Sequence, residues 1–298
     1  MSERITNSML TTTLLGDLQN VTNALSKTQS ELSSGMRIQK PSDDPFGTSQ
    51  ALGYRADLAS NAQYQTNVND GSAWLNTTDS ALGDISSLVL RARDLVVQGA
   101  NSSTGPSGNN DIAAEIDQII ESLKTDGNSQ YAGQYIFSGT KTSTAPYAAG
   151  ADDTYSGDTG TVSRQIGAGV QVPVNVDGAS VLGDGSSGLI ATLRQISTDL
   201  KSNNIAALGS TDLSALDTAS DNVSTIRATV GARADRLTTA LSRLQSLQES
   251  STSLLSDTED ADMAQTIVTY SQQQAVYQAA LKAGAQIIQP SLMDFLST

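Results

Sequence analysis

Cysteine and histidine are both missing from this chain of 298 residues. Without cysteine there is no disulfide bridge, thiol nucleophile or zinc finger, and without histidine there is no imidazole base. Most of the familiar hydrolytic sites are excluded together with these two residue types. We therefore expect a protein that is not an enzyme and that holds no cofactor and no metal ion.

Aromatic residues are scarce, at 4% of the chain. Most of the buried surface must therefore come from Leu, Val, Ile and Ala. That composition favours thin helical bundles over one thick globule. The length is sufficient for a sizeable core and for two or three units.

Positive charge and long apolar runs are also lacking. The chain has 17 Lys and Arg against 31 Asp and Glu, a formal net charge of −14, which predicts no nucleic-acid partner and no anionic membrane partner. No apolar run approaches 18 residues, so we expect no transmembrane helix. The start, MSERITNSMLTTTLL, lacks the apolar core of a cleavable leader. Composition alone favours the cytosol, with export by a leaderless route as the alternative.

Heptad spacing marks the first predicted helix. Its apolar positions follow each other in steps of 4 and 3, as in a coiled-coil seam, at Leu14, Leu18, Val21, Leu25, Thr28 and Leu32. Thr28 and the polar residues around this seam weaken it, so the helix alone should be marginal.

A break rich in Gly, Pro and Asp follows this helix. Gly35 is placed to end it, and residues 36–43 predict an extended crossing anchored by Ile38. Asp44 before Pro45 fits an N-cap with proline at the first helical position, and Asp43 suits the positive end of that helix. The joint motif comprises Gly35, Arg37, Ile38, Pro41, Asp43, Asp44 and Pro45. A catalytic pair at Asp43 and Asp44, or a contact with a basic residue of another subunit, are the weaker interpretations.

Two more helices are predicted before residue 130. The first spans about 45–100, and its later seam is Leu75, Thr78, Leu82, Ile85, Val89, Ala92 and Val96. Trp74 flanks this seam as a packing anchor; a sugar-stacking role is the weaker interpretation. NSSTGPSGNN (101–110) predicts a turn or loop, and a third helix follows with Ile112, Ile116, Ile119, Ile120 and Leu123 on one side.

The pattern then becomes that of β-structure. GQYIFSGT (133–140) predicts a strand, and residues 141–188 predict a small β-insert. Val170, Val172, Val174 and Val176 alternate as in a half-buried strand, Pro173 indicates an edge, and Asp177-Gly178 indicates a turn. GDGSSG (183–188) matches a dinucleotide fingerprint, but no second parallel strand follows, so a turn is the stronger interpretation.

Helical spacing returns for the rest of the chain. A helix is predicted from Leu189 to Leu200, and a long one over about 212–256. The long one has two stripes, one at Val223, Val230, Leu237 and Leu244, the other at Ile226, Arg233, Ala240, Leu247 and Leu254. Ser256 and Glu259 have the spacing of a capping box for the last helix. DTEDAD (257–262) lacks the ligand spacing of a calcium loop. Pro290 should end or bend the last helix.

The first and last helices each need a partner, and the simplest solution is that they pair with each other in antiparallel fashion. We expect a mainly α protein: a long antiparallel helical bundle or coiled coil with terminal helices and a small inserted β-domain. Its expected segments are 1–43, 44–140, 141–188, 189–256 and 257–298. The candidate assembly interface is Leu14, Leu18, Val21, Leu25, Leu32, Met263, Ile267, Tyr270, Tyr277, Leu281, Ile288, Leu292 and Phe295.

The stretch LSSGMRIQKPSDDPFGTSQALGYRADLASNAQYQTNVNDGSAWLNTTDSALGDI (32–85) resembles the N-terminal region of the bacterial flagellin superfamily. The likeness continues in EDADMAQ (259–265) and through the last helix. Three features are most similar to the hook–filament junction branch: KPSDDP, GQYIFSGTKTSTAPY (133–147) and the ending IIQPSLMDFL. The β-insert is matched only loosely.

The resemblance implies a secreted structural protein, exported unfolded by the flagellar type III apparatus and located at the hook–filament junction. It implies a ring-like layer made by self-association, with the first hook-associated protein, flagellin and an export chaperone as partners. It also reverses the preference for the cytosol that composition gave. Two alternatives stay open: a filament flagellin, and a cytoplasmic coiled-coil signalling protein.

Overall fold

The computed structural model describes residues 7–101, 105–150 and 152–296. Its contacts divide the chain into two compact units. The terminal unit comprises residues 1–59 and 248–298, and the central unit comprises residues 60–247. The finer division into five segments stays a prediction.

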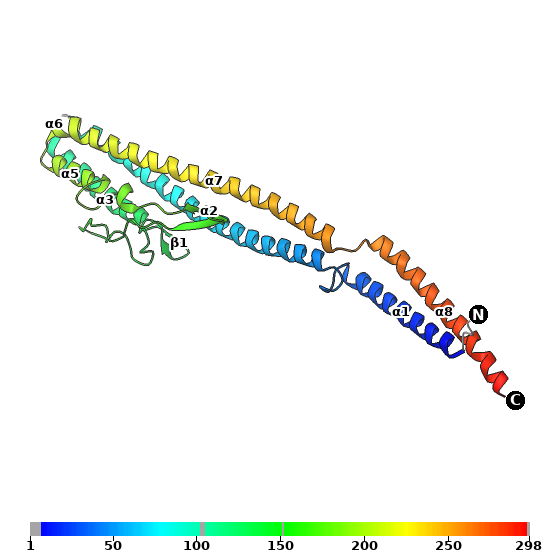
Figure 1. The fold of residues 1–298 in the computed structure, drawn as a ribbon. Helices are drawn as coiled ribbons and strands as arrows, with labels where there is room; N and C mark the ends of the chain where they lie inside the picture. Colours follow the sequence, from blue (N-terminus) through cyan, green and yellow to red (C-terminus); the bar gives the residue numbers. More distant parts are fainter. Residues whose placement is uncertain (1–6, 102–104, 151, 297–298) are drawn as a thin grey trace. The chain divides into compact units, whose positions relative to one another are not determined.

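The terminal unit is built from both ends of the sequence. It holds α1 (Asn7–Ser34), the start of α2 (Pro45–Gly99), the end of α7 (Leu213–Glu259) and α8 (Met263–Leu296). Helices α1 and α8 lie side by side and run in opposite directions (Figure 1). The prediction that the first and last helices pair is therefore confirmed.

The central unit has an aliphatic core between α2, α3 (Gly105–Gly127), α5 (Leu189–Lys201) and α7. Every residue of the predicted α2 seam is at most 1% exposed, namely Leu75, Thr78, Leu82, Ile85, Val89, Ala92 and Val96. Trp74 is buried in the same core, with the ring of Tyr131 edge-on at 5.8 Å. The core is thus built mainly from aliphatic side chains of helices, as the low aromatic content predicted for a mainly α fold.

The β-structure of the central unit is slighter than the sequence indicates. Two antiparallel pairs are present: β1 (Gln130–Tyr131) with β2 (Gln134–Tyr135), and β3 (Ser163–Gly167) with β4 (Val170–Pro173). The strand predicted over 133–140 was wrong beyond Tyr135. Gly133 and Gly139 both have positive φ, at 78° and 68°, so the chain turns at each of them and cannot extend through the segment.

The alternating valines are confirmed in part. Val172, Val174 and Val176 are buried, but Val170 is 41% exposed and β4 ends at Pro173. Because β4 belongs to a two-stranded pair, the proline does lie on an edge strand. Asp177-Gly178 is not a hairpin turn: the Asp177 side chain accepts a hydrogen bond from the amide of Ala179 and caps the short α4 (Gly178–Val181).

Three predicted boundaries were also wrong. Helix α3 begins at Gly105, inside the stretch expected to be a loop, because a proline such as Pro106 is tolerated in the first helical turn. Helix α7 continues to Glu259, so Ser256 and Glu259 do not form a capping box at the start of α8. Helix α8 continues through Pro290 to Leu296. The short α6 (Ile205–Ala207) and the π-turn η1 (Leu208–Asp212) precede α7.

The turn predicted at the end of the β-insert is confirmed. Residues 183–188 form a turn, in which Asp184 accepts hydrogen bonds from the amides of Ser186 and Ser187. The first α7 stripe is buried, whereas Leu247 of the second is 48% exposed. Among the described residues, no helix is both long and apolar enough to cross a bilayer.

Candidate assembly interface

The predicted seam of α1 faces α8. Leu14, Leu18, Val21, Leu25 and Leu32 are each half-buried, and Thr28 is 5% exposed. The outer side of α1 includes Leu15, which is 62% exposed. The heptad spacing therefore identified the inward side of α1 correctly.

The less exposed side of α8 includes only some of the residues predicted for the interface. Thr266 and Gly284 are buried and Gln273 is half-buried, together with Tyr270 and Tyr277, which were predicted. Ile267 and Leu281 are 53% and 46% exposed in the single chain, so their assignment to the assembly interface stays a prediction. Met263 is also exposed, at 42%. The side chains of Ile288, Leu292 and Phe295 lie outside the described part of the structure.

Gly284 marks the close approach of the two helices. A Cβ atom at this position would lie 2.9 Å from Cδ2 of Leu14, closer than carbon atoms pack. A glycine in a helix interior costs about 1 kcal/mol relative to alanine, and here it leaves room for the leucine. Nothing in the residue spacing of the last helix marks Gly284 as the contact point.

The terminal unit leaves a large set of apolar side chains exposed. Each of the following is at least 42% exposed: Met9, Leu15, Phe46, Leu52, Leu254, Met263, Ile267, Val268, Val276 and Leu281. Single exposed leucines are ordinary. Together these side chains leave apolar area that contact with another protein would bury. The arrangement can bury apolar area against a partner.

The joint motif ties the end of α1 to the end of α7. Gly35 has φ of 73°, a conformation that favours glycine, and its carbonyl accepts a hydrogen bond from the amide of Ala261 at 2.8 Å. The amide of Arg37 donates to the carbonyl of Glu259 at 2.7 Å, and the Arg37 guanidinium donates to the carbonyl of Thr258 at 2.8 Å. Residues 35–37 and 258–261 therefore form one hydrogen-bonded crossing.

The start of α2 confirms the predicted cap. The amide of Gly47 donates to the Asp44 carboxylate at 2.9 Å, directly after Pro45 at the first helical position. Ile38 is 8% exposed, which confirms it as the anchor. A Cβ at Gly47 would lie 2.6 Å from both Ile38 Cδ1 and Asp44 Oδ2, so glycine lets the anchor and the cap meet.

Asp43 has a role that the sequence did not reveal. Its carboxylate accepts hydrogen bonds from the amides of Lys40, at 3.0 Å, and Gln39, at 3.3 Å, and thus holds the turn before α2. The hydrogen bond from Lys40 is the main reason that the pKa of Asp43 is lowered. A carboxylate that is held ionised in this way is poorly suited to be the acid of a catalytic pair.

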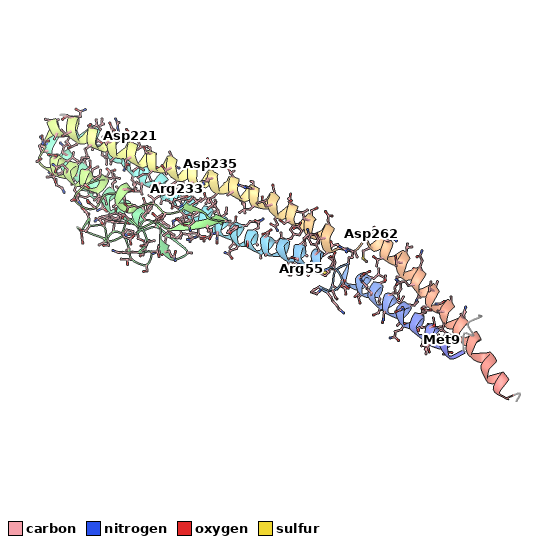
Figure 2. The ribbon with its side chains drawn as sticks, viewed as in Figure 1. Met9, Arg55, Asp221, Arg233, Asp235 and Asp262 are labelled. Carbon is pink, nitrogen blue, oxygen red and sulfur yellow. The ribbon has the colours of Figure 1, made fainter. Side chains whose placement is uncertain are left out.

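An ion pair and a second cap complete the joint, and the sequence reasoning missed both roles. Arg55 of α2 donates to the Glu259 carboxylate at 2.7 Å, and the Glu259 side chain is 8% exposed. Asp262 caps α8 by accepting from the amides of Ala264 and Gln265. Arg55 and Asp262 are labelled in Figure 2. The spacing of Ser256 and Glu259 had suggested a capping box. Glu259 was therefore not considered as a partner of Arg55, and Asp262 was not considered as the cap of α8.

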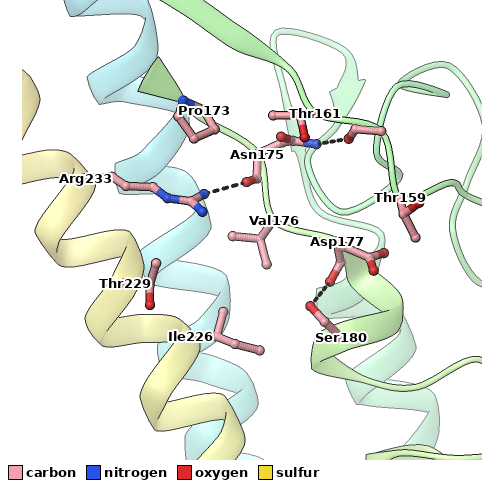
Figure 3. Close-up of a pocket in the computed structure, with 11 residues that line it drawn as sticks. Thr159, Thr161, Pro173, Asn175, Val176, Asp177, Ser180, Ile226, Thr229 and Arg233 are labelled. Atoms are coloured by element: carbon pink, nitrogen blue, oxygen red, sulfur yellow. Dashed lines mark hydrogen bonds between the residues drawn. The ribbon is translucent and has the colours of Figure 1, made fainter. Parts of the chain in front are cut away.

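A separate hollow of about 340 Å³ lies in the central unit, between the β-insert and α7 (Figure 3). Its Arg233 guanidinium donates to the carbonyl of Asn175 at 2.9 Å, and its Asp177 carboxylate is the α4 cap. Both charged groups thus have structural partners. In the part of the chain that the structure describes, no group of three or more acidic residues is placed to hold a metal ion.

Two family descriptions match most of the chain. "Bacterial flagellin N-terminal helical region" matches residues 5–142, and "Bacterial flagellin C-terminal helical region" matches residues 213–296. The unmatched part, 143–212, contains the β3–β4 pair, α4 and α5. The matched ranges therefore include both ends that build the terminal unit, together with the central parts of α2, α3 and α7.

The similar proteins include both a hook-associated protein and a filament flagellin, the two flagellar alternatives that the sequence left open. Flagellar hook-associated protein 3 of Salmonella typhimurium is 27% identical over 94% of this chain and 95% of its own length. Flagellin of Bacillus subtilis is 28% identical over 95% of each chain. The crystal structure of the flagellar junction protein FlgL from Legionella pneumophila has a TM-score of 0.59 and 15% identity, covering 71% of this chain and all of that one, which shows a shared fold.

Proposed function

Because the chain belongs to the bacterial flagellin family, we propose that it is the structural subunit that forms the junction layer between hook and filament. The observation that carries the proposal is the terminal unit itself. The two ends of the sequence meet there as α1 and α8, and their outer sides keep Leu15, Ile267 and Leu281 exposed. Burial of about 100 Å² of apolar surface against a neighbour contributes about 2.5 kcal/mol, which is the physical source of self-association.

The partners and the route of the protein belong to the same proposal. Copies of the chain associate through the terminal units into a ring-like layer. One side of the layer meets the first hook-associated protein and the other meets flagellin. The chain reaches that place by type III export, held before export by a chaperone. The relatives are structural flagellar proteins, and the role assigned here is structural and not enzymatic.

Immunogold labelling of isolated flagella tests the location. A single band at the distal end of the hook is the expected result. Label along the whole filament contradicts the junction assignment, and label confined to the cell body contradicts the flagellar assignment altogether. The cytoplasmic coiled-coil signalling protein is the alternative that the last outcome would support.

Filament flagellin is the second candidate, favoured by the 28% identity with the Bacillus subtilis flagellin over nearly the full length of both chains. A deletion strain separates the two candidates. If this chain forms the junction, the strain makes hooks and releases filament subunits into the medium as free monomer. If this chain is the filament subunit, the released monomer is absent as well as the filament.

A further inference from the structure

The methionines of this chain all belong to the terminal unit. The sequence has five of them, Met1, Met9, Met36, Met263 and Met293, and each falls within residues 1–59 or 248–298. The central unit, residues 60–247, has none. Met9 is 64% exposed and Met263 is 42% exposed, whereas Met36 is half-buried. Met1 and the side chain of Met293 lie outside the described residues.

The thioether of methionine is the group on this surface that an oxidant attacks first. The sequence has no cysteine, and its single tryptophan, Trp74, is 1% exposed. The sulfur lone pair attacks one oxygen of hydrogen peroxide, so an S–O bond forms and the O–O bond breaks. The proton left on the new S–OH group passes to the departing hydroxide and gives water. Sulfur loses two electrons, the peroxide gains them, and an apolar side chain becomes a polar sulfoxide.

The two exposed methionines lie on the apolar surface of the terminal unit. Met263 begins α8 and lies one turn before Ile267, so these two side chains are neighbours on one side of the helix. On α1, Met9 and Leu15 are both more than 60% exposed. A sulfoxide at Met9 or Met263 has to lose its hydration when a neighbour covers this surface, and that loss opposes association.

We propose that Met9 and Met263 are reversible oxidation sites that decide whether the terminal unit joins a second copy of the chain. The inference rests on the proposed function, in which copies associate through their terminal units. The thioether form is flexible and polarizable and packs against a neighbour, whereas the sulfoxide form does not. Because the chain has no thiol of its own, a separate dithiol reductase restores the thioether. The oxygen leaves as water and the two thiols of the reductase become a disulfide.

Polar substitution tests the effect of oxidation on assembly in cells that lack the wild-type protein. The double variant Met9→Gln with Met263→Gln carries a polar side chain of similar length at both sites, and we expect about tenfold less of it in isolated flagella. Met9→Leu with Met263→Leu should assemble normally. Gln, Leu and Met have similar helix propensities, so both isolated proteins should keep the wild-type helical content. Leu90→Gln, at a 55% exposed position of the central unit, is the matched control.

Oxidation rates test whether a neighbour covers the two sites. The purified full chain and isolated flagella are treated with the same dose of hydrogen peroxide, and mass spectrometry follows the sulfoxide at Met9 and Met263. We expect both sites to react at least about tenfold more slowly in flagella, because assembly removes them from solvent. A short synthetic peptide with one methionine, added to each tube, reports the oxidant delivered.

Reversal is measured on the oxidised purified chain. Sulfoxide reductases for the two epimers should return Met9 and Met263 to the thioether, since both side chains are exposed in the single chain. A site that stays oxidised under this treatment contradicts reversible control.

The outcomes separate this inference from the function on which it rests. Loss of the glutamine variant from flagella, together with protection of both methionines there, supports the oxidation sites. Assembly of the glutamine variant at the wild-type level overturns the inference, and so do equal oxidation rates in flagella and in the purified chain. In either case the junction assignment stands. If the wild-type chain is missing from flagella, the proposed function itself is wrong.

Discussion

The guanidinium of Arg55 lies 2.7 Å from the carboxylate of Glu259, and joins the start of α2 to the end of α7 inside the terminal unit. The carbonyl of the same Glu259 accepts the amide of Arg37. One residue thus holds α2 through its side chain and the joint through its backbone. The Glu259 side chain is only 8% exposed, so its pairing with Arg55 helps to fix the geometry of the joint.

The first prediction concerns this pair. Arg55→Ala leaves the buried Glu259 carboxylate without its cation. We expect the terminal unit to lose about 1–2 kcal/mol of stability. The loss is small for a buried carboxylate because Arg55 itself is half exposed. Hydrogen exchange of the amides of Arg37 and Ala261 measures the loss. Arg236→Ala, on the exposed side of α7, is the control, and equal protection in both variants would count against the pair.

The second prediction uses two glycines of the terminal helices. Gly16 of α1 has open space where a Cβ would stand, whereas at Gly284 of α8 that atom would lie 2.9 Å from Leu14. Gly16→Ala should stabilise its helix by about 0.5–1 kcal/mol, since alanine is the better helix former. Gly284→Leu should separate α1 from α8. Thermal unfolding followed by circular dichroism compares the two, and a Gly284→Leu protein as helical and stable as wild type would refute the close contact.

Local periodicity explains what the sequence could and could not reveal. The α2 seam from Leu75 to Val96 was predicted residue by residue because one stripe of that helix is apolar and it meets one core. Helix α8 has apolar residues on more than one side, so spacing alone could not tell that Thr266 faces α1 while Ile267 stays exposed. Among the described residues nothing covers the Ile267 side, and spacing within one helix does not tell which of its apolar sides stays exposed.

Contacts between distant segments were the other limit. Arg55 with Glu259 joins residues 204 positions apart, and nothing in either neighbourhood marks the pairing. The Asp44 cap, by contrast, was predicted correctly, because a cap and the proline after it are adjacent in the sequence. The strand expected over 133–140 was wrong because its residue types suit a strand while its glycines turn the chain.

The third prediction concerns a buried lysine of the central unit. The Lys124 side chain is 2% exposed, and its ammonium group binds the Asp153 carboxylate and the carbonyl of Asp152. Lys124→Met leaves that carboxylate with Arg194 alone, and we expect a loss of about 3 kcal/mol or more. Urea unfolding gives the change, and limited proteolysis should cut near Asp153 sooner. Lys201→Met, whose ion pair is half exposed, should cost less than about 1 kcal/mol.

The fourth prediction is a pH dependence at the two acids beside η1. Asp212 is 6% exposed, and its burial, followed by the charge of Asp199 from α5, raises the pKa of Asp212. The stabilising effect of the protonated group is complete below its ordinary pKa of 3.8 and is lost as the pH rises through the raised value. Asp212→Asn keeps a donor toward Asp199 without a titratable proton, and should gain roughly 1 kcal/mol at neutral pH.

Urea unfolding of Asp212→Asn and wild type at pH 5 and pH 8 measures that effect. The advantage of the variant should grow with pH, because only the wild type loses its proton. Asp221→Asn removes an exposed α7 carboxylate, labelled in Figure 2, and should change stability equally at both pH values. An advantage of Asp212→Asn that shrinks toward pH 8 would contradict a raised pKa of Asp212.

The fifth prediction separates folding from assembly. Leu18→Asp places a charge in the half-buried seam between α1 and α8, so it should both loosen that pair and abolish assembly while leaving the helices over 60–247 folded. Ile267→Asp changes a side chain that is 53% exposed in the single chain. It should leave the helical content and stability of the isolated protein within about 0.5 kcal/mol of wild type and still prevent incorporation into flagella.

Leu90→Asp, at a 55% exposed position of α2 in the central unit, is the matched control for both variants. Labelled protein in isolated flagella is the measurement for all three. Ile267→Asp is the decisive variant, because its loss of assembly cannot be traced to a loss of folding. Incorporation of Ile267→Asp at the wild-type level would mean that this exposed side of α8 meets no neighbour, and that the apolar residues of the terminal unit do not drive self-association.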